Sequence, residues 1–426
     1  MPYYLRHFFQ PDFNHTAIRP AAMADGTTHD RYLGFVQSVV AGQTLAELIY
    51  LDSLPEGVAA RDDAQPEIAE KSGGEARAAQ KLAPAENPWY KAFLMGLHDI
   101  DPRFVYNTPV FPLGPNCARD TNKPNRISAL INGFCFYHQG LITVKRMLNV
   151  RQDVNFRTGN IIFASDILVH GDVYPGFRLT GNNIRVKGRI DGGVLRAGAS
   201  VVAESVVKGA PTALIDAKGT VRVASCEQAR IITPGNCIID GNCMYSELFV
   251  GGSLIVKGRL QGGVAHAGGL VYVKNQLGDS RGVATRLCLG YAPEDVLSLQ
   301  TLNAMQEDQS QKLQDHTSRA RKGPQFAAEA APYQELATAK LEIIKTLQRA
   351  ARRKMSADPR GAEHLRVIVP GAVYPGVEIS IGRAYSKIID ECRNVFFRLN
   401  EDEIESGFPA LAKGHAFAAR TERDAG

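Results

Sequence analysis

The chain has 426 residues, 44% of them hydrophobic, and a net charge of +5 from 49 basic and 44 acidic residues. These charges are spread along the sequence, so they do not by themselves indicate a nucleic-acid-binding protein. We find no apolar run long enough to span a membrane and no signal-peptide core, and the seven cysteines lack a CxxC pair, so we expect a cytoplasmic protein without a membrane span.

Residues 1–128 are expected to form an N-terminal β-rich domain. It contains an alternating apolar run at residues 32–40 and the segment AGQTLAELIYLD at residues 41–52. Residues 53–86 have few large apolar side chains, so they cannot bury enough surface to offset the cost of ordering, and we predict a flexible insertion there. A short helix capped by Asn87 is expected to follow.

Residues 129–292 are expected to form one domain, and from Ser165 to about Leu289 the sequence repeats a short pattern. Residues 186–198 read VKGRIDGGVLRAG and residues 256–268 read VKGRLQGGVAHAG, with nine of the thirteen positions identical. Between them, looser copies restart at a glycine every 16–21 residues. This period fits one coil of a β-solenoid, in which short strands stack about 4.8 Å apart and glycines such as Gly188 and Gly258 form the corners. We therefore predict a mainly β protein built on a β-helix.

The two closest copies place basic side chains at equivalent outward positions four coils apart. If the coils superpose, this face is basic, and it is either ordinary surface or a docking site for an acidic protein partner. Nucleic acid is not expected as the ligand, because no aromatic residues alternate with the basic ones. The residues of this candidate docking face, called here the basic ladder residues, are Lys187, Arg189, Arg196, Lys257 and Arg259, with His266 at the position equivalent to Arg196.

Residues 293–356 are expected to form an antiparallel helical hairpin, a short coiled coil. The first helix carries a seam of leucines interrupted by glutamines, and Gly323-Pro324 separates it from the second helix. Because the glutamines weaken the seam, we expect the hairpin to need support from the solenoid or from another subunit, so the chain could form a homo-oligomer through the hairpin or the solenoid. The predicted seam residues are Leu299, Leu302, Gln306, Gln309 and Leu313 in the first helix, and Leu336, Ile343, Leu347 and Ala350 in the second.

Strand patterns return at residues 357–405, which we expect to complete or cap the solenoid, followed by a tail at 406–426. Residues 171–176 read GDVYPG and residues 371–376 read GAVYPG. In both, a proline (Pro175, Pro375) and a glycine (Gly176, Gly376) have the chemistry of a type II turn. The hairpin is therefore predicted to be an insertion between solenoid coils.

Nothing in the repeat region predicts catalysis, a cofactor or a metal ion. Polysaccharide-cleaving β-helices need converging carboxylates or a cage of acidic oxygens for Ca²⁺, whereas the acidic residues here are scattered singly. Cys226, Cys237 and Cys243 lie within two coils, but Cys237 falls in register with the inward Val221, which favours small core residues over metal ligands. The scattered acidic residues are Asp166, Asp172, Asp191, Glu204, Asp216, Glu227, Asp240, Glu247 and Asp279.

Several of these segments together resemble the bacterial flagellar assembly protein A family. They are DVNFRTGNIIFASDILVHGDVYPGF at residues 153–177, the repeated VKG-x-h-x-GG, the helical insertion, and GAVYPGVEISIG with VFFRLNEDEIE near the end. AGQTLAE at residues 41–47 resembles a motif of the family's N-terminal domain. The resemblance implies a right-handed β-solenoid with a coiled-coil arm, in a cytoplasmic bacterial protein linked in some members to polar flagellum assembly. Residues 53–128 depart from the family pattern.

We therefore expect a non-enzymatic scaffold that binds protein partners in the cytoplasm, with a place at a cell pole implied by the resemblance. Two alternatives stay open. One is a structural polymer of solenoids that associate end to end, and the other is a carbohydrate-active β-helix enzyme.

Overall fold

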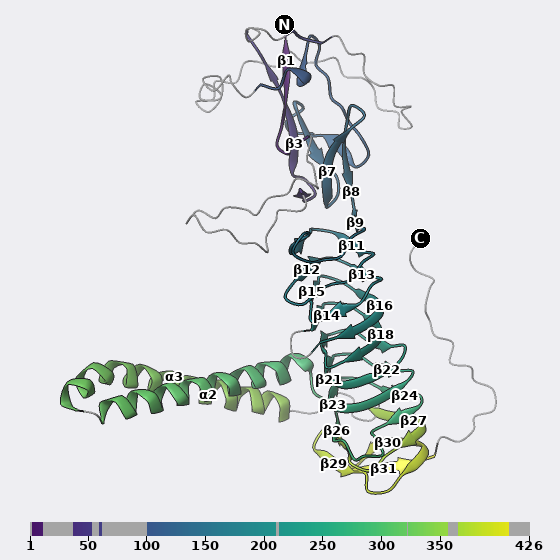
Figure 1. Ribbon diagram of the computed structural model, residues 1–426, viewed down its shortest axis with the longest axis vertical. Helices are drawn as coiled ribbons and strands as arrows, with labels where there is room; N and C mark the ends of the chain where they lie inside the picture. Colours follow the sequence, from purple (N-terminus) through teal and green to yellow (C-terminus); the bar gives the residue numbers. More distant parts are fainter. Residues whose placement is uncertain are drawn as a thin grey trace. The chain divides into compact units, whose positions relative to one another are not determined.

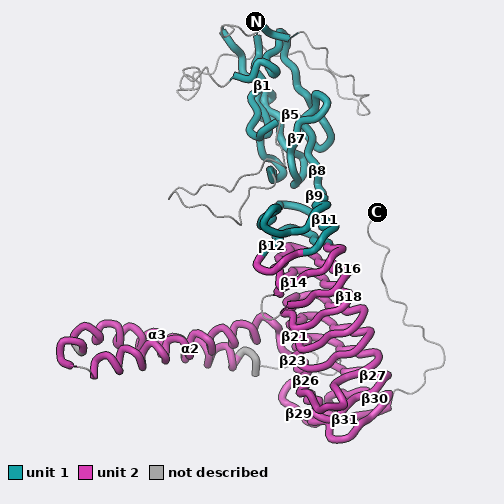
Figure 2. The backbone as a smooth tube through the Cα atoms, viewed as in Figure 1, with its two compact units in different colours: residues 1–172, 177–185 teal, residues 173–176, 186–426 magenta. Residues whose placement is uncertain are grey.

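The computed structural model describes residues 2–11, 37–52, 59–61, 100–209, 213–321, 323–356 and 365–408. Most of the predicted insertion, the helix expected from Asn87 and all but the first three residues of the predicted tail lie outside the described residues. The chain folds as two compact units, shown in Figure 2. Unit 1 holds residues 1–172 and 177–185, and unit 2 holds residues 173–176 and 186–426.

Unit 1 contains two small antiparallel sheets around one apolar core. The first has the strand order β4-β1-β3-β6-β5 and the second the order β2-β7-β8. Leu5, Leu48, Ile127 and Ile142 are among its fully buried side chains, so the β-rich character predicted for the N-terminal region is confirmed. The elements are β1 (Tyr3–His7), β2 (Ser38–Val39), β3 (Thr44–Tyr50), the 3-10 turn η2 (Pro102–Phe104), β4 (Val105–Tyr106), β5 (Cys117–Arg119), β6 (Arg126–Ala129), β7 (Gly133–His138) and β8 (Leu141–Lys145).

The first solenoid strands follow in unit 1 and start at β9 (Met147–Val150), so the predicted start of the solenoid at residue 129 was too early: β7 and β8 pair in an antiparallel sheet instead. β9 pairs in parallel with β11 (Asp166–Val169), and β10 (Ile161–Ile162) with β12 (Arg178–Gly181). Parallel pairing of strands about one coil apart is the pattern of a solenoid. β13 (Ile184–Val186) lies where the two units meet in the sequence.

Unit 2 contains stacked coils (Figure 1), and the pairing of their strands defines three faces, with some strands running from one face onto the next. On face A, Val201, Val221, Cys237, Leu254 and Val271 pair in succession, which gives coil lengths of 20, 16, 17 and 17 residues. Face A is made of the first part of β16 (Val201–Lys208) and of β18 (Val221–Glu227), then β20 (Cys237–Ile239), β22 (Leu254–Val256), β24 (Val271–Val273) and β27 (Arg366–Val373).

The other two faces repeat this parallel register. Face B contains β14 (Ile190–Asp191), the ends of β16 and β18, the starts of β21 (Cys243–Val250) and β23 (Arg259–Ala267), and β25 (Gln276–Leu277). Face C contains β15 (Val194–Ala197), β17 (Leu214–Ala217), β19 (Arg230–Thr233), the ends of β21 and β23, β26 (Thr285–Leu289) and β28 (Val377–Ile381). The predicted β-solenoid is confirmed.

The core of the stack consists of aliphatic side chains at alternate positions. On face C, Leu195, Ile215, Ile231 and Leu248 form one such column, and all four are fully buried. Alternation of inward apolar and outward polar residues is what a strand with one buried face requires. The same columns therefore determine which side chains each coil presents to the outside.

The glycines at the corners serve two different needs. Gly176 (φ +82°) and Gly376 (φ +89°) occupy the left-handed region, as the predicted type II turns require. Gly258 has no positive φ, but a Cβ there would lie 2.5 Å from the backbone oxygen of Gly241 in the neighbouring coil, so it is needed for close approach. Gly188 is not among the described residues with positive φ.

The helical hairpin interrupts the chain between β26 and β27 but does not interrupt the ladder. Helices α2 (Pro293–Ala320) and α3 (Pro324–Ser356) lie side by side (Figure 1). On either side of the insertion, β24 pairs with β27 and β26 with β28, residue by residue. The prediction of an insertion between coils is confirmed.

The seam between the helices differs from the predicted one on α3. The α2 seam is as expected, with Leu299, Leu302, Gln306 and Leu313 half-buried. On α3, however, Leu336, Ile343 and Leu347 are 53%, 61% and 50% exposed and Ala350 is exposed as well. The seam is formed instead by Ala330, Ala337, Leu341, Ile344 and Gln348.

The reason for this difference is the polar character of the α2 seam. The Gln348 side-chain amide donates to Oδ1 of Asn303 (2.9 Å) and to Oε1 of Gln306 (2.7 Å). A leucine at this position would leave those two oxygens without these hydrogen bonds, which is costly in a partly buried site. The buried strip of α3 is thus the one whose Gln348 can bond to α2.

The last strands reverse the direction of the ladder. β29 (Ala384–Lys387) runs antiparallel to β28, β30 (Cys392–Asn400) antiparallel to β27, and β31 (Glu403–Gly407) antiparallel to β30. Arg398 and Glu405 form an ion pair of 2.7 Å between the two outermost strands. Charged residues at the edge of a sheet discourage further strand addition, and capping of the stack by these strands stays a prediction.

Candidate docking surfaces

The register of the coils places the predicted basic ladder residues in equivalent positions. Arg196, Asp216, Ile232, Phe249 and His266 form one continuous column on face C, so Arg196 and His266 are four coils apart. On face B, Ile190 and Leu260 occupy the same column, which makes the preceding Arg189 and Arg259 equivalent. All five basic ladder residues are exposed: Lys187, Arg189, Arg196, Lys257 and Arg259. Their docking role stays a prediction.

The charge of this surface is mixed, whereas the sequence led us to expect a basic face. Asp216 lies next to Arg196 in its column. Asp240 binds Arg222 (2.8 Å) in the coil before it and Lys257 (2.8 Å) in the coil after it. Hydrogen bonds from these two side chains, that of Arg222 above all, lower the pKa of Asp240. A partner would therefore meet alternating charges along these coils.

The carboxylates of the solenoid are mostly held by basic neighbours. Ion pairs join Asp166 to Arg146, Glu227 to Lys208, Asp240 to the two basic residues described above, Glu247 to Arg230, and Asp279 to Arg281. Glycoside cleavage needs two carboxyl groups that face one bond across a groove. These ion pairs give no such arrangement, so the observations support charged surface rather than a catalytic pair.

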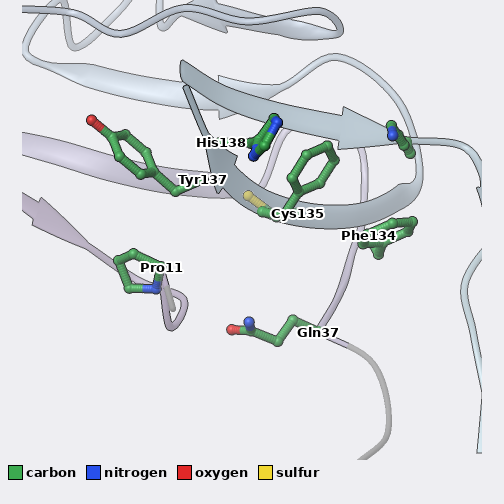
Figure 3. A pocket seen from close by; sticks show the side chains of 8 residues that line it. Pro11, Gln37, Phe134, Cys135, Tyr137 and His138 are labelled. Atoms are coloured by element: carbon green, nitrogen blue, oxygen red, sulfur yellow. The ribbon is translucent and has the colours of Figure 1, made fainter. Parts of the chain in front are cut away.

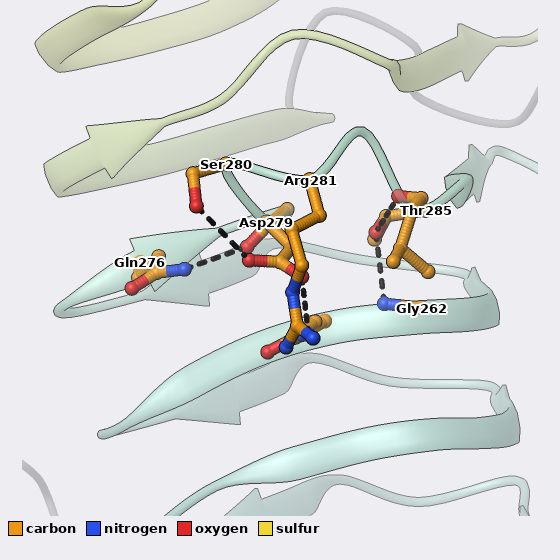
Figure 4. Close-up of polar contacts among 9 residues, drawn as sticks. Gly262, Gln276, Asp279, Ser280, Arg281 and Thr285 are labelled. Atoms are coloured by element: carbon orange, nitrogen blue, oxygen red, sulfur yellow. Dashed lines mark hydrogen bonds and ion pairs between the residues drawn. The ribbon is translucent and has the colours of Figure 1, made fainter.

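The most buried of these carboxylates is Asp279, which is 7% exposed (Figure 4). Its Oδ2 accepts hydrogen bonds from Nε2 of Gln261 (2.8 Å) and from Nε of Arg281 (3.1 Å). Close by, the backbone N–H of Gly262 donates to Oγ1 of Thr285 (2.9 Å). Both hydrogen bonds from β23 join it to the next coil, so this network links the turn after β25 to β23.

The three neighbouring cysteines are all buried. Cys237 pairs with Val221 in the inward column, as predicted, and the Sγ atoms of Cys226 and Cys243 lie 3.3 Å apart in adjacent coils. Burial raises the pKa of the Cys237 thiol, and the hydrogen bond to Cys226 followed by burial raises that of Cys243. Protonated, buried thiols are poor metal ligands and poor nucleophiles. Among the described residues, no group of three or more His, Cys, Asp or Glu is placed to hold a metal ion.

The base of α2 contacts face C through a cluster of Arg230, Phe249, His266 and Gln300. The Phe249 and His266 rings stack at 5.0 Å, and the Arg230 guanidinium lies 5.1 Å from the centre of the Phe249 ring. Arg230 also donates to Oε1 of Gln300 on α2 (3.2 Å). This cluster ties the hairpin to the solenoid, and sequence analysis missed it because the contact joins residues 70 positions apart.

Burial lowers the pKa of His266 below its ordinary value near 6.5. The unfolded chain therefore binds this proton at a higher pH than the folded chain, so the stability contributed by the neutral imidazole is lost as pH falls below about 6.5. We expect His266→Phe, which keeps an aromatic ring on Phe249, to reduce this loss. Denaturant midpoints of both proteins, measured above and below that pH, test it, and equal shifts in the two proteins would contradict it.

The hairpin carries an exposed apolar stripe. We define the α3 stripe as Tyr333, Leu336, Ile343 and Leu347, which are between 50% and 61% exposed. Of these, Tyr333 also stacks on His316 of α2 with ring centres 5.2 Å apart. Large apolar side chains gathered on one line of a helix are uncommon on a surface that only meets water.

Unit 1 has an open depression of about 410 Å³ beside β7, shown in Figure 3. Its lining includes Gln37, Phe134, Phe136 and His138, and the Lys145 ammonium lies 4.8 Å from the centre of the Phe136 ring. Sequence analysis did not single out this place. The available signal was the alternation in GFCFYH, which puts Phe134, Phe136 and His138 on one side of the strand.

The comparisons with known proteins give one match. A family model described as the Flagellar Assembly Protein A beta solenoid domain matches residues 146–404, which is more than half of the chain. No curated protein and no solved structure matches the chain. None of the helices in the described part of the chain is long and apolar enough to cross a membrane.

Proposed function

Because the chain belongs to the flagellar assembly protein A (FapA) family, we propose that it is a scaffold that holds protein partners during flagellar assembly, without catalysing a reaction. The family is not a known enzyme family and suggests a role related to flagella. The proposed place of action is the cytoplasm, at the cell pole where such an organelle would be built.

The observation that carries this proposal is the way the hairpin is inserted. The coils on its two sides pair as if no residues lay between them, and α2 is fixed to face C through Arg230 and Gln300. A continuous ladder resists bending because every coil is hydrogen-bonded to its neighbours. The chain thus combines a stiff body with a separate helical module, which is an arrangement suited to binding several partners at fixed places.

For the solenoid surface we propose an acidic protein partner that docks on the basic ladder residues. Arg189 and Arg259 are exposed and lie four coils apart in one column. Exposed charges at an interface mainly set the rate of association and the choice of partner. The mixed charges between these two residues would select a partner whose own charges match the spacing of the coils.

The test is complementation in the native host. A strain that lacks this chain should lose flagella or misplace them, as counted by electron microscopy, and the wild-type gene should restore them. We expect the double variant Arg189→Glu, Arg259→Glu to restore clearly fewer flagella. The matched control is Lys218→Glu, Arg366→Glu, which makes the same change of charge at exposed positions outside the basic ladder residues.

Two outcomes would count against the proposal. Normal flagella in the strain that lacks the chain would contradict the proposed function. Full restoration by the double variant at normal protein levels would contradict only the proposed docking face and would leave the scaffold proposal standing.

A further inference from the structure

We propose that the α3 stripe binds the α3 stripe of a second copy of this chain in antiparallel orientation, so that two hairpins form a four-helix bundle. This pairing does not depend on the basic ladder residues. It is carried by the exposure of the stripe, by its spacing and by the distribution of charge along α3.

The hairpin leaves its larger apolar side chains outside its own seam. The buried α3 seam contains two alanines and Gln348, with Leu341 and Ile344 as the large apolar residues. Tyr333, Leu336, Ile343 and Leu347 lie on the neighbouring strip of the same helix and are at least half exposed. A helix usually buries its widest apolar strip, so this strip is suited to a further helix.

The spacing of the stripe is that of a coiled-coil seam. With Lys340 and Ala350, its residues follow one another at steps of three and four: 333, 336, 340, 343, 347 and 350. In an antiparallel pair, Leu336 of one copy faces Leu347 of the other, Tyr333 faces Ala350, and Lys340 faces Ile343. Each contact occurs twice because a two-fold axis relates the copies.

The residues beside the stripe fit a close approach. Ala339 and Thr346 flank it on the side away from the α2 seam, and both are small and exposed. In the antiparallel register they face each other across the axis. Small side chains at such positions let two helices pack closely, as ridges enter grooves.

Charge selects the antiparallel orientation. The first half of α3 carries Glu329 and Glu335, and the last turns carry Arg349, Arg352 and Arg353. In the antiparallel register Glu329, which continues the stripe toward the start of α3, lies near Arg353 of the other copy. A parallel pair would instead place glutamates against glutamates and arginines against arginines, which is unfavourable.

The first experiment measures mass in solution. The full chain of 46.3 kDa is expected to sediment as two copies at micromolar concentration. Ile343→Glu buries a charge twice in each pair, so the association should weaken by at least about 100-fold. Thr338→Glu is the matched control, since Thr338 is exposed on α3 away from the stripe and lies about 7.5 Å from Ile343 along the helix axis. Circular dichroism checks that both variants keep their helices.

The second experiment tests orientation with a short bismaleimide. Leu336→Cys and Leu347→Cys, each alone, should cross-link little beyond the wild-type background, because in the antiparallel pair identical residues lie roughly 16 Å apart along the axis. A mixture of the two variants should cross-link efficiently. A parallel pair would give the opposite result, with each variant cross-linking to itself.

The proposal is overturned by a wild-type chain that sediments as a single copy, by an Ile343→Glu variant that pairs as the wild type does, or by equal loss of pairing in Thr338→Glu. Efficient self-linking of Leu336→Cys would overturn the orientation. Pairing that is lost in Ile343→Glu alone, together with cross-linking of the mixture, supports it.

Discussion

Gly263→Ala is expected to lower the free energy of unfolding by about 2–5 kcal/mol. Gly263 lies within β23 where the chain passes from face B to face C, with φ +81°. A Cβ there would meet the backbone oxygen and nitrogen of Ser246 in the neighbouring coil, and backbone atoms in a ladder cannot move aside. The substitution therefore adds a steric clash to the strain of a left-handed residue. Denaturant unfolding of both proteins measures the difference.

A second glycine separates these two costs. Gly282 has a similar φ of +73°, but a Cβ there would have no atom within 4 Å. Gly282→Ala should thus cost only the backbone strain, about 1 kcal/mol. Equal losses in the two variants would show that the close approach of the coils at Gly263 is not what requires glycine.

Asp279→Ala is expected to destabilise the solenoid by about 2–3 kcal/mol. The substitution removes the acceptor for the buried Gln261 amide, which is 6% exposed, and leaves that donor without its bond. The ion pair with Arg281 adds little, because the Arg281 side chain is 80% exposed. Asp279→Asn keeps the shape and one acceptor oxygen, so it should lose about 1 kcal/mol. Thermal and denaturant unfolding give both values.

This pair of variants also bears on the alternative of a carbohydrate-active enzyme. A carboxylate kept for catalysis can usually be replaced without loss of stability, whereas one kept for structure cannot. Unchanged stability of Asp279→Ala would contradict the structural role of Asp279. It would instead favour the alternative in which this carboxylate takes part in catalysis.

The solenoid could be predicted from the sequence because each coil requires the same kinds of residue at the same positions. The thirteen-residue match between residues 186–198 and 256–268 reflects two segments that occupy equivalent parts of their coils, four coils apart. Inward positions need apolar side chains and corners need glycine, so the pattern survives in each coil. For the same reason Cys237 could be placed in the core before its position was known.

The hairpin seam could not be predicted correctly, because α3 carries two candidate strips. One has the larger apolar residues and the other has alanines and Gln348. Choosing between them requires knowing which α2 atoms face α3, and the Asn303 and Gln306 oxygens accept hydrogen bonds from Gln348.

The prediction of a basic docking face was wrong for a related reason. Asp216 and Asp240 belong to coils between the two matched copies, and their register depends on coil lengths that vary from 16 to 20 residues.

The reversal of strand direction at β29, β30 and β31 bears on whether another solenoid can add to this end of the stack. An incoming coil from another molecule would offer hydrogen-bonding groups in parallel spacing, while the exposed border presents the antiparallel spacing together with the charges of Arg398 and Glu405. This border therefore disfavours end-to-end addition of another solenoid. A body of fixed length would keep the proposed partners at a fixed separation, which an open-ended filament could not do.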